Sequence, residues 1–152
     1  MSINKDLMFS SATDNWATPQ EFFNQLNEEF HFSIDACADS FNHKTERYYT
    51  IEDDGLSKGY AGEVVFCNPP YGRAIGKWVK KFFDEVNEGG CELAVMLLPA
   101  RTDTAWFHNY IYGKAEIRFV KGRIKFGGSK HNAPFPSMIV VFRSNAQSTR
   151  KS

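Results

Sequence analysis

Four consecutive residues, Asn68, Pro69, Pro70 and Tyr71, bring together groups that suit an exocyclic amine on a planar base. The Asn side chain offers a carbonyl acceptor, and the proline after it has a carbonyl with no competing N–H. Two hydrogen bonds accepted from an NH2 group would pull its nitrogen toward tetrahedral geometry and free the lone pair for attack. The Tyr ring adds a flat face on which a base could stack. We predict these four residues as catalytic. The structural alternative is that Pro-Pro ends a strand while Asn caps a helix and Tyr covers the core.

Two further segments join this tetrapeptide at predicted strand ends. Ligands of open α/β sheets bind beyond the carboxyl ends of the strands, where the strand order reverses. The segments Asp35–Asp39, Asn68–Tyr71 and Pro99–Thr104 each follow a predicted strand. We therefore expect the chemistry of this chain where these segments meet. For Asp35 and Asp39 a second interpretation stays open, because Asp side chains also stabilise turns.

Apolar periodicity and turn residues predict the elements that position these segments. Apolar residues recur at helical spacing after Thr18, which forms a capping-box pattern with Glu21, and Pro19 suits the first turn. The whole chain gives predicted helices from residue 18 and at 76–86 and 103–112, with predicted strands at 31–34, 63–67, 93–98, 116–120 and 137–142. Residues 122–126 are predicted to start a hairpin. Residues 40–63 are predicted to be mostly loop, with one strand or helical turn near 48–51.

Strands that alternate with helices and are apolar on both faces predict an α/β fold with a mostly parallel sheet and helices on both faces. The last two strands have no helix between them, so we expect the sheet to end in an antiparallel edge. Polar sequence at both ends predicts a loose arm at residues 1–15, a single domain at 16–143 and a polar tail at 144–152.

The composition excludes several classes of protein. The chain has 152 residues, 42% of them hydrophobic and 24% charged, which suits one globular domain. No apolar run approaches the ~20 residues of a membrane span, and the N-terminus lacks the pattern of a signal peptide. Three cysteines without C-x-x-C spacing argue against a disulfide framework or a zinc knuckle, and the four histidines show no ligand spacing. We therefore expect no metal and a cytoplasmic location.

The formal net charge of zero conceals a division along the chain. Residues 1–76 hold 5 Lys and Arg against 12 Asp and Glu, whereas residues 77–152 hold 13 against 6. A positive half of this kind suits a polyanion, because phosphate contacts supply most non-specific affinity for nucleic acid. The candidate phosphate contacts lie in predicted loops of that half: Arg101, Lys121, Arg123, Lys125 and Lys130. A solvated basic face is the alternative interpretation.

The chain resembles the phage-type DNA N-6-adenine methyltransferases, the Dam-like phage family. An N-P-P-Y tetrapeptide after an apolar strand is the signature of amino-methyltransferases that use S-adenosylmethionine. The matching blocks follow one order along the chain: 14–19, 34–39, 54–56, 65–71, 97–107 and 122–126. This resemblance implies an abbreviated Rossmann-like methyltransferase sheet, double-stranded DNA as the partner and a phage or prophage origin.

The resemblance also implies roles for individual residues. Asn68 and Pro69 would accept hydrogen bonds from the N6 amine of an adenine that has left the duplex, and Tyr71 would stack on that base. The residues implied on the cofactor side are Trp16, Thr18, Pro19, Asp35, Ala36, Asp39 and Asp54. For Trp16 simple core packing is the alternative, and for Asp54 it is an exposed Asp-Gly turn.

Two features of the chain depart from the family pattern, and the N-P-P-Y tetrapeptide itself tolerates other acceptors. Residues 35–41 contain no glycine where most methyltransferases have a glycine-rich loop, and the chain leaves little room for a full seven-stranded sheet or a target-recognition domain. Sequence reading would then fall to loops or to a second subunit, although nothing else indicates an oligomer. The alternative acceptors are cytosine N4, RNA adenine and protein glutamine. A catalytically silent nucleic-acid-binding module is the non-enzyme alternative.

Overall fold

The computed structural model describes residues 16–127 and 130–144. The predicted arm at 1–15 and nearly all of the predicted tail lie outside the described residues. The helices are α2 (Gln20–Phe30) and α3 (Ile75–Asn87), together with two 3₁₀ turns (Ile51–Asp53 and Gly55–Ser57) and a short π-helix (Phe107–Ile111). The strands are β1 (Ile34–Asp35), β2 (Val64–Cys67), β3 (Leu93–Pro99), β4 (Glu116–Phe119) and β5 (Ser137–Arg143).

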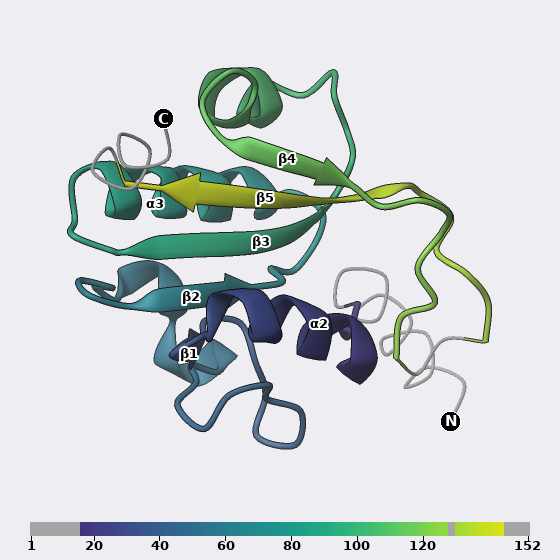
Figure 1. Ribbon diagram of the computed structural model, residues 1–152, viewed down its shortest axis with the longest axis horizontal. Coiled ribbons are helices and arrows are strands. Elements are labelled where there is room, and N and C mark those ends of the chain that lie inside the picture. Colours follow the sequence, from purple (N-terminus) through teal and green to yellow (C-terminus); the bar gives the residue numbers. More distant parts are fainter. Residues whose placement is uncertain (1–15, 128–129, 145–152) are drawn as a thin grey trace.

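The strands form one five-stranded mixed sheet in the order β1-β2-β3-β5-β4, which Figure 1 shows from the front. β1, β2 and β3 run parallel, and β5 pairs antiparallel with both β3 and β4. The prediction of a mostly parallel sheet is therefore correct for one half only. The last strand returns into the sheet beside β3 instead of adding outside β4, so antiparallel pairing extends inward from the edge.

Helices pack on both faces of the sheet, as the sequence predicts (Figure 1). α3 buries Trp78, Val79 and Phe82 in a cluster with alternate residues of β2, β3 and β5. α2 buries Phe23 and Leu26 in a second cluster on the opposite face. The burial of β3 and of most of β5 explains why both strands read as continuous apolar runs.

Local details differ from the predictions where polar side chains find other partners. Thr18 does not cap α2, which begins at Gln20 after Pro19, with no side-chain cap. The helix predicted at 103–112 contains a π-helix at Phe107–Ile111. Residues 122–126 form no strand, and Gly127 makes an isolated antiparallel bridge with Ala17. That bridge brings the segment before α2 against the segment between β4 and β5.

Across the described part of the chain, no helix combines the length and the apolar composition needed to cross a membrane.

Candidate active site

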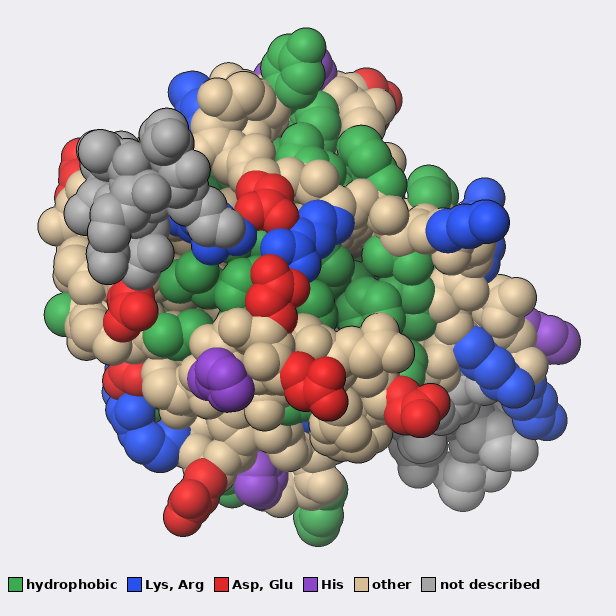
Figure 2. Space-filling view, viewed as in Figure 1, with side chains coloured by type: hydrophobic (Ala, Val, Ile, Leu, Met, Phe, Trp, Pro, Cys, Tyr) green, Lys and Arg blue, Asp and Glu red, His purple; other side chains and the backbone are tan. Residues whose placement is uncertain are grey.

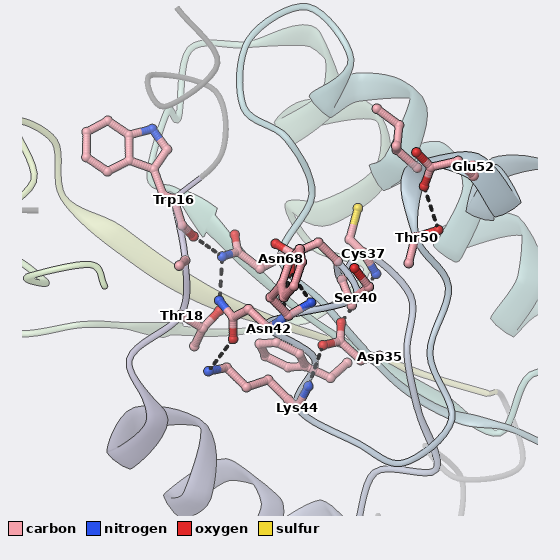
Figure 3. A pocket seen from close by; sticks show the side chains of 16 residues that line it. Trp16, Thr18, Asp35, Cys37, Ser40, Asn42, Lys44, Thr50, Glu52 and Asn68 are labelled. Carbon is pink, nitrogen blue, oxygen red and sulfur yellow. Dashed lines mark hydrogen bonds between the residues drawn. The ribbon is translucent and has the colours of Figure 1, made fainter. Parts of the chain in front are cut away.

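Asn68 lies directly after the carboxyl end of β2 and is held by the segment that precedes α2. Its side-chain Nδ2 donates hydrogen bonds to the backbone carbonyl of Trp16 and, at 3.0 Å, to Thr18 Oγ1. These bonds fix the orientation of the amide (Figure 3). Its other end, Oδ1, is buried and has no hydrogen-bond partner among the described residues. A buried acceptor of this kind is costly unless a ligand or an ordered water supplies a donor.

The other three residues of the tetrapeptide differ in their exposure. Pro69 is buried and Pro70 lines a cavity beside Asn68. Tyr71 is 3% exposed, and its hydroxyl donates to the Leu97 carbonyl at 3.1 Å. Burial raises the pKa of Tyr71, so the phenol stays neutral. The structure therefore places Tyr71 in the core. Its ring makes a T-shaped contact with Phe135 at a centroid distance of 5.6 Å, and the stacking of a base on this ring stays a prediction.

Two neighbouring cavities adjoin Asn68. The larger has a volume of about 410 Å³ and the smaller about 120 Å³. Residues that line both are Cys37, Ala38, Thr50, Ile51 and Asn68. The larger cavity also takes in Trp16, Thr18, Asp35, Asp39, Phe41, Asn42, Lys44 and Glu52. The smaller adds Ala36, Asp54, Gly55, Pro70 and Trp78. The segments predicted at the ends of β1 and β2 thus do share one site, while 99–104 contributes nothing to either cavity.

Asp35 is the most deeply buried charged residue among those that line the cavities, at 3% exposure. Burial raises its pKa, and hydrogen bonds from the backbone N–H groups of Lys44 and Cys37 act in the opposite direction. These bonds measure 2.9 Å and 3.3 Å. Asp35 therefore performs the turn-forming role that the sequence left open, and it also presents a carboxylate to the larger cavity.

The remaining predicted cofactor residues differ in their positions. Asp39 accepts hydrogen bonds from the backbone N–H groups of Phe41 and Asn42, which is the turn role, while lining the larger cavity. Asp54 is exposed at the smaller cavity and has a left-handed backbone, φ 57°. Pro19 precedes α2 and lines neither cavity.

Trp16 contributes to the site mainly through its backbone. Its carbonyl accepts the hydrogen bond from Asn68, while in Figure 3 its indole points away from the other labelled side chains. The indole packs edge-on against Phe126 and Phe135, with centroid distances of 5.4 Å and 5.3 Å. The packing role that the sequence left open for Trp16 is therefore present in the structure.

A glycine from another segment supplies the close approach that the loop after β1 lacks. A Cβ at Gly55 would lie 2.8 Å from the Ala36 carbonyl oxygen and 2.9 Å from the Trp78 ring. The Gly55 carbonyl also accepts a 2.7 Å hydrogen bond from the buried Tyr60 hydroxyl. Gly55 therefore allows close packing of Ala36 and Trp78 beside the smaller cavity, although residues 35–41 contain no glycine.

The predicted phosphate contacts lie outside the cavities. Arg101, Lys121, Arg123, Lys125 and Lys130 are all exposed. Four of them belong to the segment between β4 and β5, which the bridge from Gly127 to Ala17 joins to the Asn68 side of the molecule. Arg123 donates a 3.5 Å hydrogen bond to the Ala133 carbonyl within that segment. No Asp or Glu follows Glu116 in the sequence, so this segment is purely basic.

Sequence reasoning missed several residues of the segment between β1 and β2. Phe41 and Ile51 are 98% and 87% exposed, although both line the larger cavity. Lys44 and Glu52 line the same cavity. A sequence signal existed in Phe41 and Ile51, which are large apolar residues flanked by polar ones in a segment predicted to be mostly loop. Without a partner element in the sequence, however, nothing indicated the cavity that they border.

Comparison with known proteins agrees with the resemblance of the six sequence blocks. A family model described as DNA N-6-adenine-methyltransferase (Dam) matches residues 7–151. The DNA N-6-adenine-methyltransferase of Haemophilus phage HP1 (strain HP1c1) is 28% identical over 144 residues, which make up 90% of this chain and 82% of that protein. The DNA N-6-adenine-methyltransferase of Escherichia phage T1 is 32% identical over 113 residues, 73% of this chain and 46% of that protein. With the family model covering nearly its whole length, the chain belongs to the DNA N-6-adenine-methyltransferase (Dam) family of S-adenosylmethionine-dependent transferases.

Proposed function

We propose that this chain transfers a methyl group from S-adenosylmethionine to the N6 amine of an adenine extruded from double-stranded DNA. The observation that carries this proposal is the Oδ1 atom of Asn68, which is buried and unpartnered among the described residues. Thr18 and the Trp16 carbonyl hold the other end of the amide, so Oδ1 is oriented as an acceptor for an incoming NH2 group.

Asn68 and Pro69 act on the amine, and the cofactor supplies an electrophilic methyl group on a sulfonium. Hydrogen bonds from N6 to Asn68 Oδ1 and to the Pro69 carbonyl turn the nitrogen lone pair out of conjugation and toward the methyl group. The transfer would be a single displacement, in which the bond from N6 to the methyl carbon forms as the carbon–sulfur bond breaks, the thioether leaves and N6 loses one proton to solvent. Holding the two reactants in line would therefore provide most of the acceleration. The adenine must leave the duplex to reach Asn68.

The two neighbouring cavities suit the chemistry of the two ends of the cofactor. Asp35 presents a carboxylate to the larger cavity, as an amino-acid ammonium requires. Asp54 and Trp78 line the smaller one, where they suit an adenosine. Asn68 lines both cavities, so a sulfonium between these two ends would lie near it. Ile51 lines both cavities and Phe41 lines the larger one, so a bound cofactor would contact both of these exposed apolar side chains.

The remaining parts of the proposal concern fold, partner and place of action. Three parallel strands followed by an antiparallel β5 support an abbreviated Rossmann-like methyltransferase sheet. The basic segment between β4 and β5 contacts DNA phosphates, which position the protein without reading sequence. The phage relatives support action inside a bacterial host cell.

Product identification tests the function. Purified protein is incubated with methyl-labelled S-adenosylmethionine and unmethylated DNA, and the digested nucleosides are analysed for label. We expect label in N6-methyladenosine. Label in N4-methylcytosine would keep the mechanism and contradict the base, while cofactor binding without label would favour the RNA or glutamine acceptors.

The variant Asn68→Ala links this activity to the site. Loss of an acceptor aimed at the reacting amine should lower turnover at least ~100-fold, the scale measured for single transition-state hydrogen bonds. Cofactor affinity should stay within about tenfold. The matched control is Asn109→Ala, which removes the same side chain at an exposed position. Normal turnover in Asn68→Ala would contradict the assigned role.

A further inference from the structure

The larger cavity is lined by three carboxylates but by one cation. Asp35, Asp39 and Glu52 supply the carboxylates, and Lys44 is the one Lys or Arg among the described residues that line either cavity. Any of these three carboxylates could therefore bind the ammonium of a ligand. A ligand anion has a single positively charged side chain.

Lys44 is held in place without neutralisation of its charge. Its Nζ donates hydrogen bonds of 3.2 Å to Gln20 Oε1 and to Asn42 Oδ1, both of which are neutral amide oxygens. No ion pair within 4.0 Å joins Nζ to a carboxylate of the described residues. The Lys44 backbone N–H bonds to Asp35 Oδ2, which fixes the residue beside the buried carboxylate (Figure 3).

The surroundings of Lys44 also favour an anion. Partial burial lowers the pKa of its ammonium, and Asp35 acts in the opposite direction. An anion bound there would stabilise the charged form of Lys44, which burial disfavours. Gln20, which contacts Nζ, is the first residue of α2, and the N-terminus of that helix has no side-chain cap. Its first-turn N–H groups therefore add to the positive potential on this side of the cavity.

We propose that Lys44 Nζ binds the α-carboxylate of the cofactor's amino-acid end, with Asp35 on the ammonium of the same end. Lys44 thereby allows the site to distinguish S-adenosylmethionine from nucleoside analogues that lack the amino-acid end. This inference rests on the proposed function, because it concerns how the same cofactor is held. Because Lys44 would bind the amino-acid end and not the reacting groups, its role is in affinity and not in the transfer step.

Two ligands and one substitution test the inference in the absence of DNA. The ligands are S-adenosylmethionine and 5′-methylthioadenosine, which keeps the nucleoside and the sulfur but lacks the amino-acid end. Affinities are measured by calorimetry for the wild type and for Lys44→Met, which removes the charge and keeps most of the side-chain length. We expect S-adenosylmethionine to bind about tenfold to a hundredfold more weakly to Lys44→Met, the scale of one charge-assisted hydrogen bond. The affinity for 5′-methylthioadenosine should stay within about twofold.

Two further variants separate charge from structure. Lys44→Arg keeps a cation and should recover part of the lost affinity. Lys58→Met is the matched control, since Lys58 belongs to the same inter-strand segment but lines neither cavity. It should bind both ligands as the wild type does.

The outcomes distinguish failure of the inference from failure of the proposed function. Equal weakening of both ligands in Lys44→Met would show that Lys44 merely shapes the loop, and unchanged affinity for both would show that it touches neither ligand. Either result overturns the inference alone. Wild-type protein that binds neither ligand would overturn the proposed function and this inference with it.

Discussion

At the scale of single residues, the site depends on how one amide is oriented. The sequence indicated Asn68 as an acceptor and Thr18 as a helix cap, and it gave no sign that the two side chains meet. They are 50 positions apart, and the contact forms because the segment before α2 lies across the end of β2. A Thr hydroxyl can serve either role equally well. Only the packing of the chain therefore decides between capping and positioning.

Thr18 is consequently a positioning residue with a testable effect on turnover. Thr18→Val removes the acceptor for Asn68 Nδ2 and keeps the shape of the side chain. The amide is then fixed by the Trp16 carbonyl alone, so we expect kcat to fall roughly tenfold, about the value of one hydrogen bond. The KM for S-adenosylmethionine should change little.

The conservative variant Thr18→Ser provides the control, because it keeps the hydroxyl and should keep kcat near the wild-type value. A Thr18→Val enzyme whose KM rises while kcat is kept would assign Thr18 to cofactor binding instead of positioning.

Gly55 is a second residue whose role follows from geometry. A Cβ there would lie 2.8 Å from the Ala36 carbonyl oxygen, which is backbone and cannot easily move. Gly55→Ala should therefore lower the free energy of unfolding by about 1–3 kcal/mol, the usual range for overpacking. Urea denaturation measures the change.

Gly59→Ala is the matched control, because nothing lies within 4 Å of a Cβ at that position. It should leave stability unchanged or raise it by up to ~1 kcal/mol through a less flexible unfolded chain. Equal stability of the two variants would mean that the Ala36 carbonyl and the Trp78 ring shift to accept the added methyl group.

At the scale of elements, periodicity predicts those elements that pack on the sheet. The α2 and α3 helices and strands β2, β3 and β5 lie within a few residues of the predicted ranges, since their apolar side chains face a core. The segment between β1 and β2 lacks such a face. Its shape depends on hydrogen bonds such as those to Asp35 and Asp39, which no periodic pattern encodes. Most of the missed cavity residues belong to this segment.

Glu63 anchors this segment to the sheet through a charge. Its carboxylate accepts a 2.6 Å hydrogen bond from Ser33 Oγ and two hydrogen bonds from the Arg47 guanidinium. The Arg47 hydrogen bonds lower the pKa of Glu63, and Ser33 adds to that effect. A carboxyl group whose pKa is lowered on folding stabilises the protein above its unfolded-state pKa, near 4.3. That stabilisation is lost as the pH falls through the folded-state pKa.

The variant Glu63→Gln should therefore be less stable than the wild type at pH 7, and the difference should shrink as the pH falls below about 4. Urea denaturation of both proteins at several pH values measures it. Glu46→Gln, which alters an exposed carboxylate in the same segment, controls for general charge effects. A difference that did not depend on pH would show that the shape of Glu63, and not its charge, holds the segment.

At the scale of the whole molecule, four of the basic residues of the second half gather in one segment without Asp or Glu, the one between β4 and β5. Figure 2 shows Lys and Arg side chains along the right-hand side, where Figure 1 places the segment between β4 and β5, whereas in the middle and on the left Lys and Arg lie among Asp and Glu. The sequence predicted a basic half. It could not show that this half adjoins Asn68, because that neighbourhood depends on the Ala17–Gly127 bridge.

This arrangement predicts a specific change in salt dependence. Each phosphate contact releases counterions, so that the logarithm of the DNA affinity falls with the logarithm of salt concentration by about 0.9 per contact. Arg123→Ala should weaken duplex binding at low salt and reduce that slope by about one unit.

Lys80→Ala provides the control. Lys80 is exposed on α3, where it pairs with Asp84, and α3 packs on the sheet face opposite α2. Because Arg123 also donates to the Ala133 carbonyl, Arg123→Lys separates charge from loop structure. A slope that stayed unchanged in Arg123→Ala would assign this arginine to the structure of its segment and move the phosphate contacts to its lysines.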